Sequence, residues 1–365
     1  MAIHWGILGT GFVARQFAVS LKRVEGCILS AVASRNYQSA QQFSREIGGR
    51  ALQSFEELIA SSEVDVIYIA TPTASHAQHT RTCLEAKKAV LCEKPLATSL
   101  EEARLAIDCA RENQVFLMEA LWTRFLPIFK EVRGYIKEGK LGNIRLVQAD
   151  LSMPVPDNPC DARTVPGPGS GALLDFGVYP ISLALDLLGE PDTVQATVLR
   201  NAAGVDRQAA LTLEYHGATA VLTTGFNGKG RNDAMIIGDQ GSVQVGSPLY
   251  APQTLTMTNW PMATGSGSGR EMRRIDKLLE RADWIHVAYR YILPSLRMLL
   301  GRDSAKFKPF MGFGYQFEAQ EVVKQLNANN LESPVMSWSD STALARIIDA
   351  ARNGDNVQIR SAGQP

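Results

Sequence analysis

The most constraining feature of this 365-residue chain is a glycine turn placed between an apolar segment and a helical one. Residues 3–8 have the pattern of a short buried strand, and apolar residues recur at helical spacing from Phe12 onward. The turn between them, residues 9–14 (GTGFVA), matches the G-x-G-x-x-G/A fingerprint. Glycines there permit a tight turn and let a pyrophosphate approach the backbone at a helix N-terminus. The context predicts a Rossmann dinucleotide-binding unit, with a purely structural glycine turn as the competing interpretation.

Further apolar segments alternate with helical ones through the first third of the chain. Each expected strand is short, is rich in apolar residues and is followed by a segment with helical spacing. Alternation of this kind predicts a parallel sheet with right-handed helical crossovers. The strands expected after the first cover residues 28–33, 64–70, 89–92 and 116–119.

The pattern changes after Leu121. A helix is expected over residues 127–138 and a longer strand over 144–151, and the segments beyond residue 190 are joined by short glycine or polar turns, as in an antiparallel sheet. We therefore predict an α/β protein with a Rossmann domain (1–121) and an α+β substrate-binding domain (122–365) that contains a large, mostly antiparallel open sheet. The remaining strands are expected at 194–200, 208–215, 219–226, 234–238 and 242–245.

A Gly/Ser-rich linker at 264–270 opens a segment that we interpret as a helical insertion over about 264–310. Residues 271–300 combine six arginines and lysines with Trp284, Ile285, Tyr289 and Ile292, a basic amphipathic composition. A lid or a subunit contact is the ordinary interpretation of such a segment. Weak contact with an anionic membrane surface is the alternative.

Composition narrows the classes of partner. The chain has 37 Lys+Arg and 37 Asp+Glu residues, so no overall charge favours nucleic acid, and a small-molecule substrate is expected. Five scattered cysteines without a C-x-x-C pair suit neither a disulfide framework nor a zinc site, so we predict no metal. With no signal sequence and no long apolar run in view, the expected location is the cytoplasm.

The end of the second expected strand bears on the choice of dinucleotide. NAD sites usually carry an Asp or Glu there to bind the ribose 2′-OH, but no acidic residue occurs from Gly26 through Arg45. Ser34 can donate to a 2′-phosphate, and Arg35 can bind it with two N–H groups while stacking on adenine. NADP(H) is therefore the predicted cofactor. Arg35 as an ordinary solvated arginine remains the alternative.

Several longer motifs resemble those of the Gfo/Idh/MocA family, which includes glucose-fructose oxidoreductase-like and inositol dehydrogenase-like enzymes. They are the glycine turn, residues 71–76 (TPTASH), 92–97 (CEKPLA) and 171–180 (GALLDFGVYP). Within the family, residues 118–125 (MEALWTRF) look like the branch of the dimeric dihydrodiol dehydrogenases and NADP-dependent D-xylose 1-dehydrogenases. The resemblance covers nearly the whole chain, but the 264–310 segment is longer than the family pattern suggests.

The resemblance implies that Lys94 and Tyr179 meet the nicotinamide and the substrate, with Asp175 beside them as the third catalytic residue. Tyr179 would be the proton carrier, its pKa lowered by the Lys94 ammonium. In an anonymous sequence such a lysine is as often a surface residue, and such a tyrosine is usually a packed aromatic. The motif and the resemblance together assign cofactor binding to Gly9, Thr10, Gly11, Phe12, Val13, Ser34, Arg35, Thr71, Pro72, His76, Glu93 and Lys94.

Trp122, Arg124, Asp175 and Tyr179 are expected to bind substrate, although Trp122 is equally suited to the core and His76 to a structural role. The expected activity is that of an NADP-dependent dehydrogenase acting on a CH–OH group of a cyclic sugar or a trans-dihydrodiol. A non-catalytic NADP sensor and a dinucleotide-dependent glycosidase are the alternatives. The family resemblance also implies a homodimer.

Overall fold

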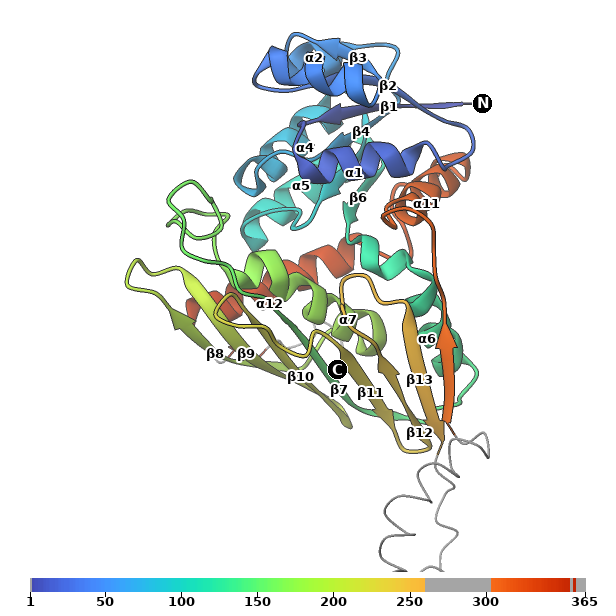
Figure 1. The fold of residues 1–365 in the computed structure, drawn as a ribbon, viewed down its shortest axis with the longest axis vertical. Helices are drawn as coiled ribbons and strands as arrows, with labels where there is room; N and C mark the ends of the chain where they lie inside the picture. Colours follow the sequence, from blue (N-terminus) through green and yellow to red (C-terminus); the bar gives the residue numbers. More distant parts are fainter. Residues whose placement is uncertain (1, 260–302, 355–356, 359–365) are drawn as a thin grey trace, which may run out of the picture.

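The computed structural model describes residues 2–259, 303–354 and 357–358, and these form two sheets with helices packed against them (Figure 1). The first sheet is parallel, with strand order β3-β2-β1-β4-β5-β6. Strands β4, β5 and β6 are buried at every residue, as expected where helices cover both faces of a parallel sheet. The strands are β1 (Ile3–Leu8), β2 (Cys27–Ala33), β3 (Arg50–Leu52), β4 (Val66–Ile69), β5 (Ala89–Glu93) and β6 (Leu117–Ala120).

The helices of this layer follow their strands in the predicted alternation, which confirms the Rossmann-like fold. Phe17 on α1 stacks on Tyr68 of β4 with ring centroids 3.6 Å apart, so the first helix is fixed to the middle of the sheet. The short strand β3 was not predicted, because three residues are too few for a periodic signal. The helices are α1 (Phe12–Leu21), α2 (Tyr37–Glu46), α3 (Phe55–Ala60), α4 (His76–Glu85) and α5 (Leu100–Asn113).

The second sheet has nine strands in the order β14-β13-β12-β11-β7-β10-β9-β8-β15. All neighbours are antiparallel except β7 and β10, so the predicted mostly antiparallel sheet is confirmed. The parallel pair arises because two helical segments and the strands β8 and β9 separate β7 from β10 in the chain. The strands are β7 (Ile144–Ser152), β8 (Thr193–Arg200), β9 (Asp206–Tyr215), β10 (Ala218–Gly225), β11 (Ala234–Gly238), β12 (Gly241–Val245), β13 (Thr254–Asn259), β14 (Asp303–Phe307) and β15 (Val357–Gln358).

Helices α7 and α12 lie between the two sheets, on the face of the second sheet that is turned toward the first (Figure 1). The chain also returns to the first sheet near its end, since the Trp338 indole donates to the Leu117 carbonyl at 3.0 Å and α11 contacts α1. The C-terminal part of the chain therefore contacts the layer of the first sheet as well as that of the second. The helical elements are α6 (Pro127–Lys137), the π-helical turn η3 (Leu173–Gly177), α7 (Val178–Leu188), α11 (Gln316–Asn327) and α12 (Trp338–Asn353), with short 3₁₀ turns η1 (Thr73–Ser75) and η2 (Trp122–Phe125).

Most of the predicted helical insertion, and with it the basic amphipathic segment 271–300, lies outside the described residues. The part of it that is described begins with β14, the edge strand of the second sheet, which pairs with β13. In the ranges that the structure describes, no helix combines the length and the apolar character needed to cross a membrane.

Candidate active site

The glycine turn joins β1 to α1 as the sequence predicted. Gly9 has a φ of +108°, and a Cβ at this position would lie 2.3 Å from the Ala70 carbonyl oxygen, so only glycine fits. Gly11 caps α1 without any side-chain hydrogen bond, and a Cβ there would meet no atom within 4 Å. The backbone at the N-terminus of α1 is therefore open to a ligand on the side of the Gly11 Cα, and the unpaired N–H groups of a first helical turn suit a bound pyrophosphate.

Polar side chains gather where β2 and β4 end. Thr10 and Ser34 hydroxyls are 3.4 Å apart, and Arg35 is exposed beside them. Thr71 Oγ1 lies 3.0 Å from Nδ1 of His79, a residue that the sequence analysis missed. Burial, together with the Arg35 charge, lowers the pKa of His79, so the imidazole is neutral near pH 7. Its only sequence signal is its position one helical turn after His76.

A cavity of about 510 Å³ extends from the glycine turn to the junction of the two sheets. Phe12, Val13 and Gln16 line its cofactor end, and Lys94, Asp175 and Tyr179 line the other. The predicted catalytic residues therefore meet in one space with part of the predicted cofactor turn. Much of the wall is aromatic and comes from distant segments: Phe12, Trp122, Phe176, Tyr179, Tyr250, Phe310, Phe313 and Tyr315.

Lys94 directly follows β5, and its amino group is held at the centre of the site. Nζ donates to the Asp175 carbonyl oxygen at 2.7 Å and to Asp175 Oδ1 at 3.0 Å, and it lies 4.9 Å from the centroid of the Tyr179 ring. Burial disfavours the ammonium, but the interactions of the amino group with Tyr179, Asp175 and Glu93 outweigh it and raise the pKa of Lys94. The lysine is therefore charged, and one of its three N–H donors is left for a substrate.

Asp175 is shared between two cations. Its Oδ2 accepts from Arg163 Nη1 at 3.2 Å, on the side opposite Lys94, and Arg163 is itself paired with Asp161 at 2.6 Å. Burial favours the neutral acid, but Lys94 and Arg163 together lower the pKa of Asp175, so the carboxylate is ionised. Arg163 was missed by the sequence analysis, because it lies in an irregular Gly/Pro-rich segment with no periodicity to place it.

Tyr179 differs from the expectation in one respect. The Lys94 ammonium does favour the tyrosinate, but burial has the larger effect, and the pKa of the Tyr179 hydroxyl is raised. In the protein without ligands the tyrosine is thus a neutral acid. The sequence could identify the neighbouring cation but not the extent of burial.

Glu93 forms the floor of the cavity next to Lys94. It accepts hydrogen bonds from the Tyr68 hydroxyl and, at 3.2 Å, from the Lys94 backbone N–H. Burial raises the pKa of Glu93 to about 7. Behind it lies Glu318 of α11, which is 0% exposed and has no hydrogen-bond partner among the described residues. Neither Tyr68 nor Glu318 was predicted to adjoin the site.

The remaining predicted residues lie in different places. Trp122 lines the cavity and stacks on Tyr315, with ring centroids 4.8 Å apart. Pro72 is exposed at the start of η1. His76 is buried between the carbonyl oxygens of Pro95 (2.7 Å) and Thr71 (2.8 Å), and it is not among the described residues that line the cavity. Its contacts are those of a residue that holds two loops together.

Arg124, expected at the substrate, lies outside the cavity lining. Its guanidinium is 4% exposed and is bound by Asp340 at 3.1 Å, by the Ser182 hydroxyl at 2.7 Å and by the Val335 carbonyl oxygen at 3.0 Å. These partners occupy its donors and tie η2 to α7 and α12. No group of three or more His, Cys, Asp or Glu side chains suited to a metal ion occurs in the described part of the chain.

The chain matches two family models. Residues 3–121 match the oxidoreductase family with an NAD-binding Rossmann fold, and residues 129–244 match the GFO/IDH/MocA C-terminal domain. Among curated proteins, the chain is 32% identical over 359 residues to the trans-1,2-dihydrobenzene-1,2-diol dehydrogenase of Danio rerio, with 96% of each chain covered.

Two solved structures share the fold. One is KijD10, a 3-ketoreductase from Actinomadura kijaniata in complex with NADP and TDP-benzene, which has 24% identity and a TM-score of 0.77 with 98% of each chain covered. The other is levoglucosan dehydrogenase in complex with NADH and levoglucosan, which has 21% identity and a TM-score of 0.78 with 97% of each chain covered. The sequence match to the diol dehydrogenase and the two family models lead to one conclusion: the chain belongs to the Gfo/Idh/MocA family of oxidoreductases.

Proposed function

We propose that this oxidoreductase is an NADP(H)-dependent dehydrogenase that acts on a ring-borne CH–OH group of a cyclic sugar or a trans-dihydrodiol. The observation that carries the proposal is the Lys94–Asp175–Tyr179 cluster, which shares one cavity with Phe12 and Val13 of the glycine turn. A secondary alcohol bound there would lie between a cation, a phenol and the cofactor. The aromatic wall supports a ring-shaped substrate, since flat apolar surfaces pack against ring faces.

The preference for NADP(H) rests on the end of β2. The related folds were solved with different dinucleotides, KijD10 with NADP and levoglucosan dehydrogenase with NADH, so the fold alone does not decide. Here Ser34 and exposed Arg35 follow β2, and Thr10 Oγ1 lies 3.4 Å from Ser34 Oγ. A 2′-phosphate would find two hydroxyl groups and a guanidinium at this position.

The bound nicotinamide would supply the hydride acceptor or donor. Lys94 uses two N–H groups on Asp175 and directs the third at the substrate oxygen, where it stabilises the developing alkoxide. Tyr179 exchanges the hydroxyl proton. Because its pKa is raised in the free protein, the tyrosine is ready to donate a proton in the reducing direction, and alcohol oxidation should accelerate as the pH rises.

Turnover assays test the proposal. The purified protein is incubated with NADP+ or NAD+ and with trans-1,2-dihydrobenzene-1,2-diol, D-xylose or levoglucosan, and formation of reduced cofactor is followed by absorbance. We expect NADP+ reduction with at least one of them. Binding of NADP+ without turnover on a wider sugar and diol panel would point to a sensor, and cleavage of a glycoside without net NADPH would point to a glycosidase.

We further infer that the chain divides near residue 121 into the Rossmann domain and the substrate-binding domain, and that it forms a homodimer in the cytoplasm. The free thiols of all five cysteines favour a reducing compartment.

In support of a dimer, no described helix covers the face of the second sheet that is turned away from the first (Figure 1), and Gln148, Val221 and Met235 line a hollow on the second sheet. Light scattering on the eluting protein would test the oligomeric state.

A further inference from the structure

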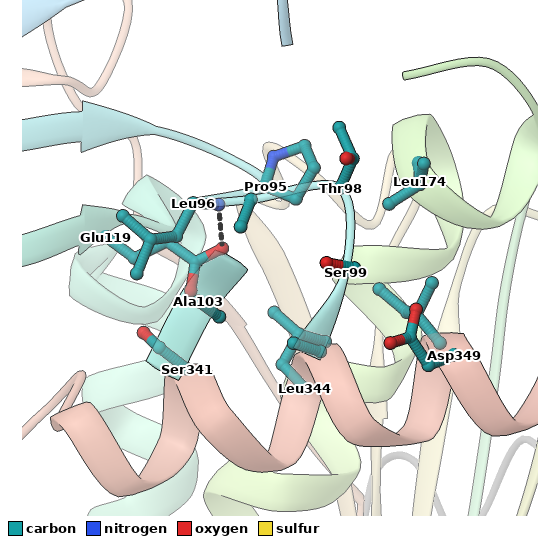
Figure 2. A pocket seen from close by; sticks show the side chains of 13 residues that line it. Pro95, Leu96, Thr98, Ser99, Ala103, Glu119, Leu174, Ser341, Leu344 and Asp349 are labelled. Atoms are coloured by element: carbon teal, nitrogen blue, oxygen red, sulfur yellow. Dashed lines mark hydrogen bonds between the residues drawn. The ribbon is translucent and has the colours of Figure 1, made fainter. Parts of the chain in front are cut away.

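The second peptide group after Lys94 is bound on both sides by buried side chains. It joins Pro95 to Leu96. Its carbonyl oxygen lies 2.7 Å from Nδ1 of His76, and its N–H donates to Oε1 of Glu119 at 2.9 Å, the contact drawn in Figure 2. His76 and Glu119 are each 2% exposed. Opposite edges of one peptide plane are thus held by groups from α4 and β6.

The position of this peptide explains why it needs such partners. Strand β5 ends at Glu93, and Pro95 has no N–H, so the Leu96 N–H is the first backbone donor after that of Lys94. Leu96 is buried, and an unpaired N–H there would be unfavourable. Glu119 supplies the acceptor that the sheet no longer provides, because β6 runs beside β5 with Glu119 opposite Cys92.

A small cavity lies next to this contact, so the loop lacks close packing on that side. Figure 2 shows Ser341 and Leu344 of α12 facing Leu96 and Glu119 across a small cavity. Its volume is about 10 Å³, which is close to the room that one water molecule needs. Replacing the Glu119 carboxylate by a shorter or apolar group would leave the Leu96 N–H unpaired beside free space.

We propose that Glu119 is a positioning residue for Lys94: it binds the Leu96 N–H, fixes the Pro95–Leu96 peptide and so keeps the lysine amino group on Asp175. The proposal rests on the role given to Lys94 under the proposed function. Glu119 does not line the active-site cavity, so it acts through the backbone and touches neither substrate nor cofactor. Its carboxyl accepts the hydrogen bond in either protonation state, which makes glutamine a fair substitute.

Three variants separate positioning from general stability. Glu119→Gln keeps the acceptor, and Glu119→Met keeps most of the volume but removes it. The matched control is Asp349→Ala, because Asp349 Oδ2 accepts from the Leu100 N–H at 2.7 Å, where the same loop enters α5, and Asp349 lines the same small cavity. We expect Glu119→Met to lower kcat by about tenfold or more with NADP+ affinity and KM nearly unchanged, since displacements of about 1 Å can cost that much.

Glu119→Gln and Asp349→Ala should stay within about threefold of the parent kcat. Equal losses in Glu119→Met and Asp349→Ala, or a Gln variant as slow as the Met variant, would refute the positioning role. Hydrogen exchange on the unmodified protein covers the case in which Glu119→Met does not fold. The Leu96 amide should exchange slowly, and fast exchange would overturn the proposal whether or not the chain is a dehydrogenase, whereas failure of the turnover assays would leave this amide protected.

Discussion

The cofactor end of the cavity and the lysine cluster at its other end differ in their materials and in their exposure. The glycine turn offers backbone N–H groups and two neighbouring side chains, Ser34 and Arg35, at the surface. The lysine cluster joins Lys94 to Asp175, 81 positions later in the chain, and its charges are largely buried. One end is a local construction that stays open to solvent, and the other depends on the two sheets being correctly packed.

Because the two ends of the cavity differ in this way, substitutions at one end should affect different properties from substitutions at the other. Changes at the glycine turn and β2 should alter binding and choice of dinucleotide, because these groups would meet only the cofactor. Changes in the lysine cluster should alter the chemical step, because under the proposed function Lys94 and Tyr179 would adjoin the reacting atoms.

The largest effect is expected at Tyr179 and Lys94. Tyr179→Phe removes only the hydroxyl and should lower kcat by about a hundredfold or more, and Lys94→Ala should lower it at least as far. NADP+ affinity should stay within a few fold for Tyr179→Phe. Steady-state kinetics and cofactor titration measure both quantities.

The double variant sharpens this test. Because Lys94 Nζ lies 4.9 Å from the Tyr179 ring, the two residues should act as one unit, and the double variant should be little slower than the slower single variant. Multiplying losses would mean independent roles. Near-normal turnover of Tyr179→Phe would move proton transfer to Lys94, Asp175 or a bound water.

The same contrast explains what the sequence could predict. The glycine turn, Ser34 and Arg35 could be assigned to the cofactor from local sequence alone, because strand, turn and helix are contiguous there and each has a periodic or glycine signal. Lys94, Asp175 and Tyr179 were assigned by resemblance. They belong to the family motifs 92–97 and 171–180, and the resemblance implied that these two motifs lie at one site. Arg163 comes from an irregular segment, and Glu318 comes from α11, far along the chain from the motifs. Neither residue has a sequence pattern that would place it near the site.

Burial was the second quantity that the sequence did not supply. Burial raises the pKa of Tyr179, whereas the sequence predicted a lowered one. Arg124 was expected at the substrate but is enclosed between helices and paired with Asp340. Both outcomes depend on how α7 packs against the second sheet and against α12 and η2. Local patterns of apolar residues predict that such helices have a buried face, but not which polar groups become enclosed.

Arg35→Ala should have the next largest effect, confined to the cofactor end. With no acidic residue from Gly26 through Arg45, the parent protein should bind NADP+ at least about tenfold more tightly than NAD+, which is about 1.4 kcal/mol, and the substitution should remove most of that preference. The kcat at saturating NADP+ should change little. Titration by tryptophan fluorescence measures the affinity for each dinucleotide. If Arg35→Ala left the ratio of the NADP+ and NAD+ affinities unchanged, Arg35 would not be the residue that binds the 2′-phosphate.

Arg163→Ala should have a smaller effect at the lysine cluster. The Arg163 side chain is 44% exposed, so its 3.2 Å contact with Asp175 is screened by solvent. Its removal leaves Asp175 paired with Lys94 alone and should lower kcat by about fivefold or less, with NADP+ affinity unchanged. Arg163→Lys should recover part of the loss. A hundredfold loss would instead mean that Arg163 contacts the substrate.

Glu318→Gln should have the smallest effect, on stability and not on binding or turnover. The Glu318 carboxyl is 0% exposed and has no partner among the described residues, so burial raises its pKa well above the usual range, and the charge of Glu93 adds to the shift. An unfolded glutamate titrates near about 4.3. The native protein therefore keeps a proton that the unfolded chain releases, and the resulting stability is complete below that pH and is lost as the pH rises through the native pKa. Because burial raises the native pKa of Glu318 well above its usual range, we expect that loss to extend over the pH range above about 4.3. Glutamine never ionises, so Glu318→Gln should melt a few degrees (about 2–5 °C) above the parent protein at pH 8 and at nearly the same temperature at pH 5.

Glu321→Gln is the control on the same helix, because the Glu321 carboxylate already accepts from Ser333 at 2.8 Å and from Gln325 at 2.6 Å. Thermal unfolding of the three proteins from pH 5 to pH 8 makes the comparison. A gain that is independent of pH, or one that Glu321→Gln reproduces, would show that the ionisation of Glu318 is not its cause.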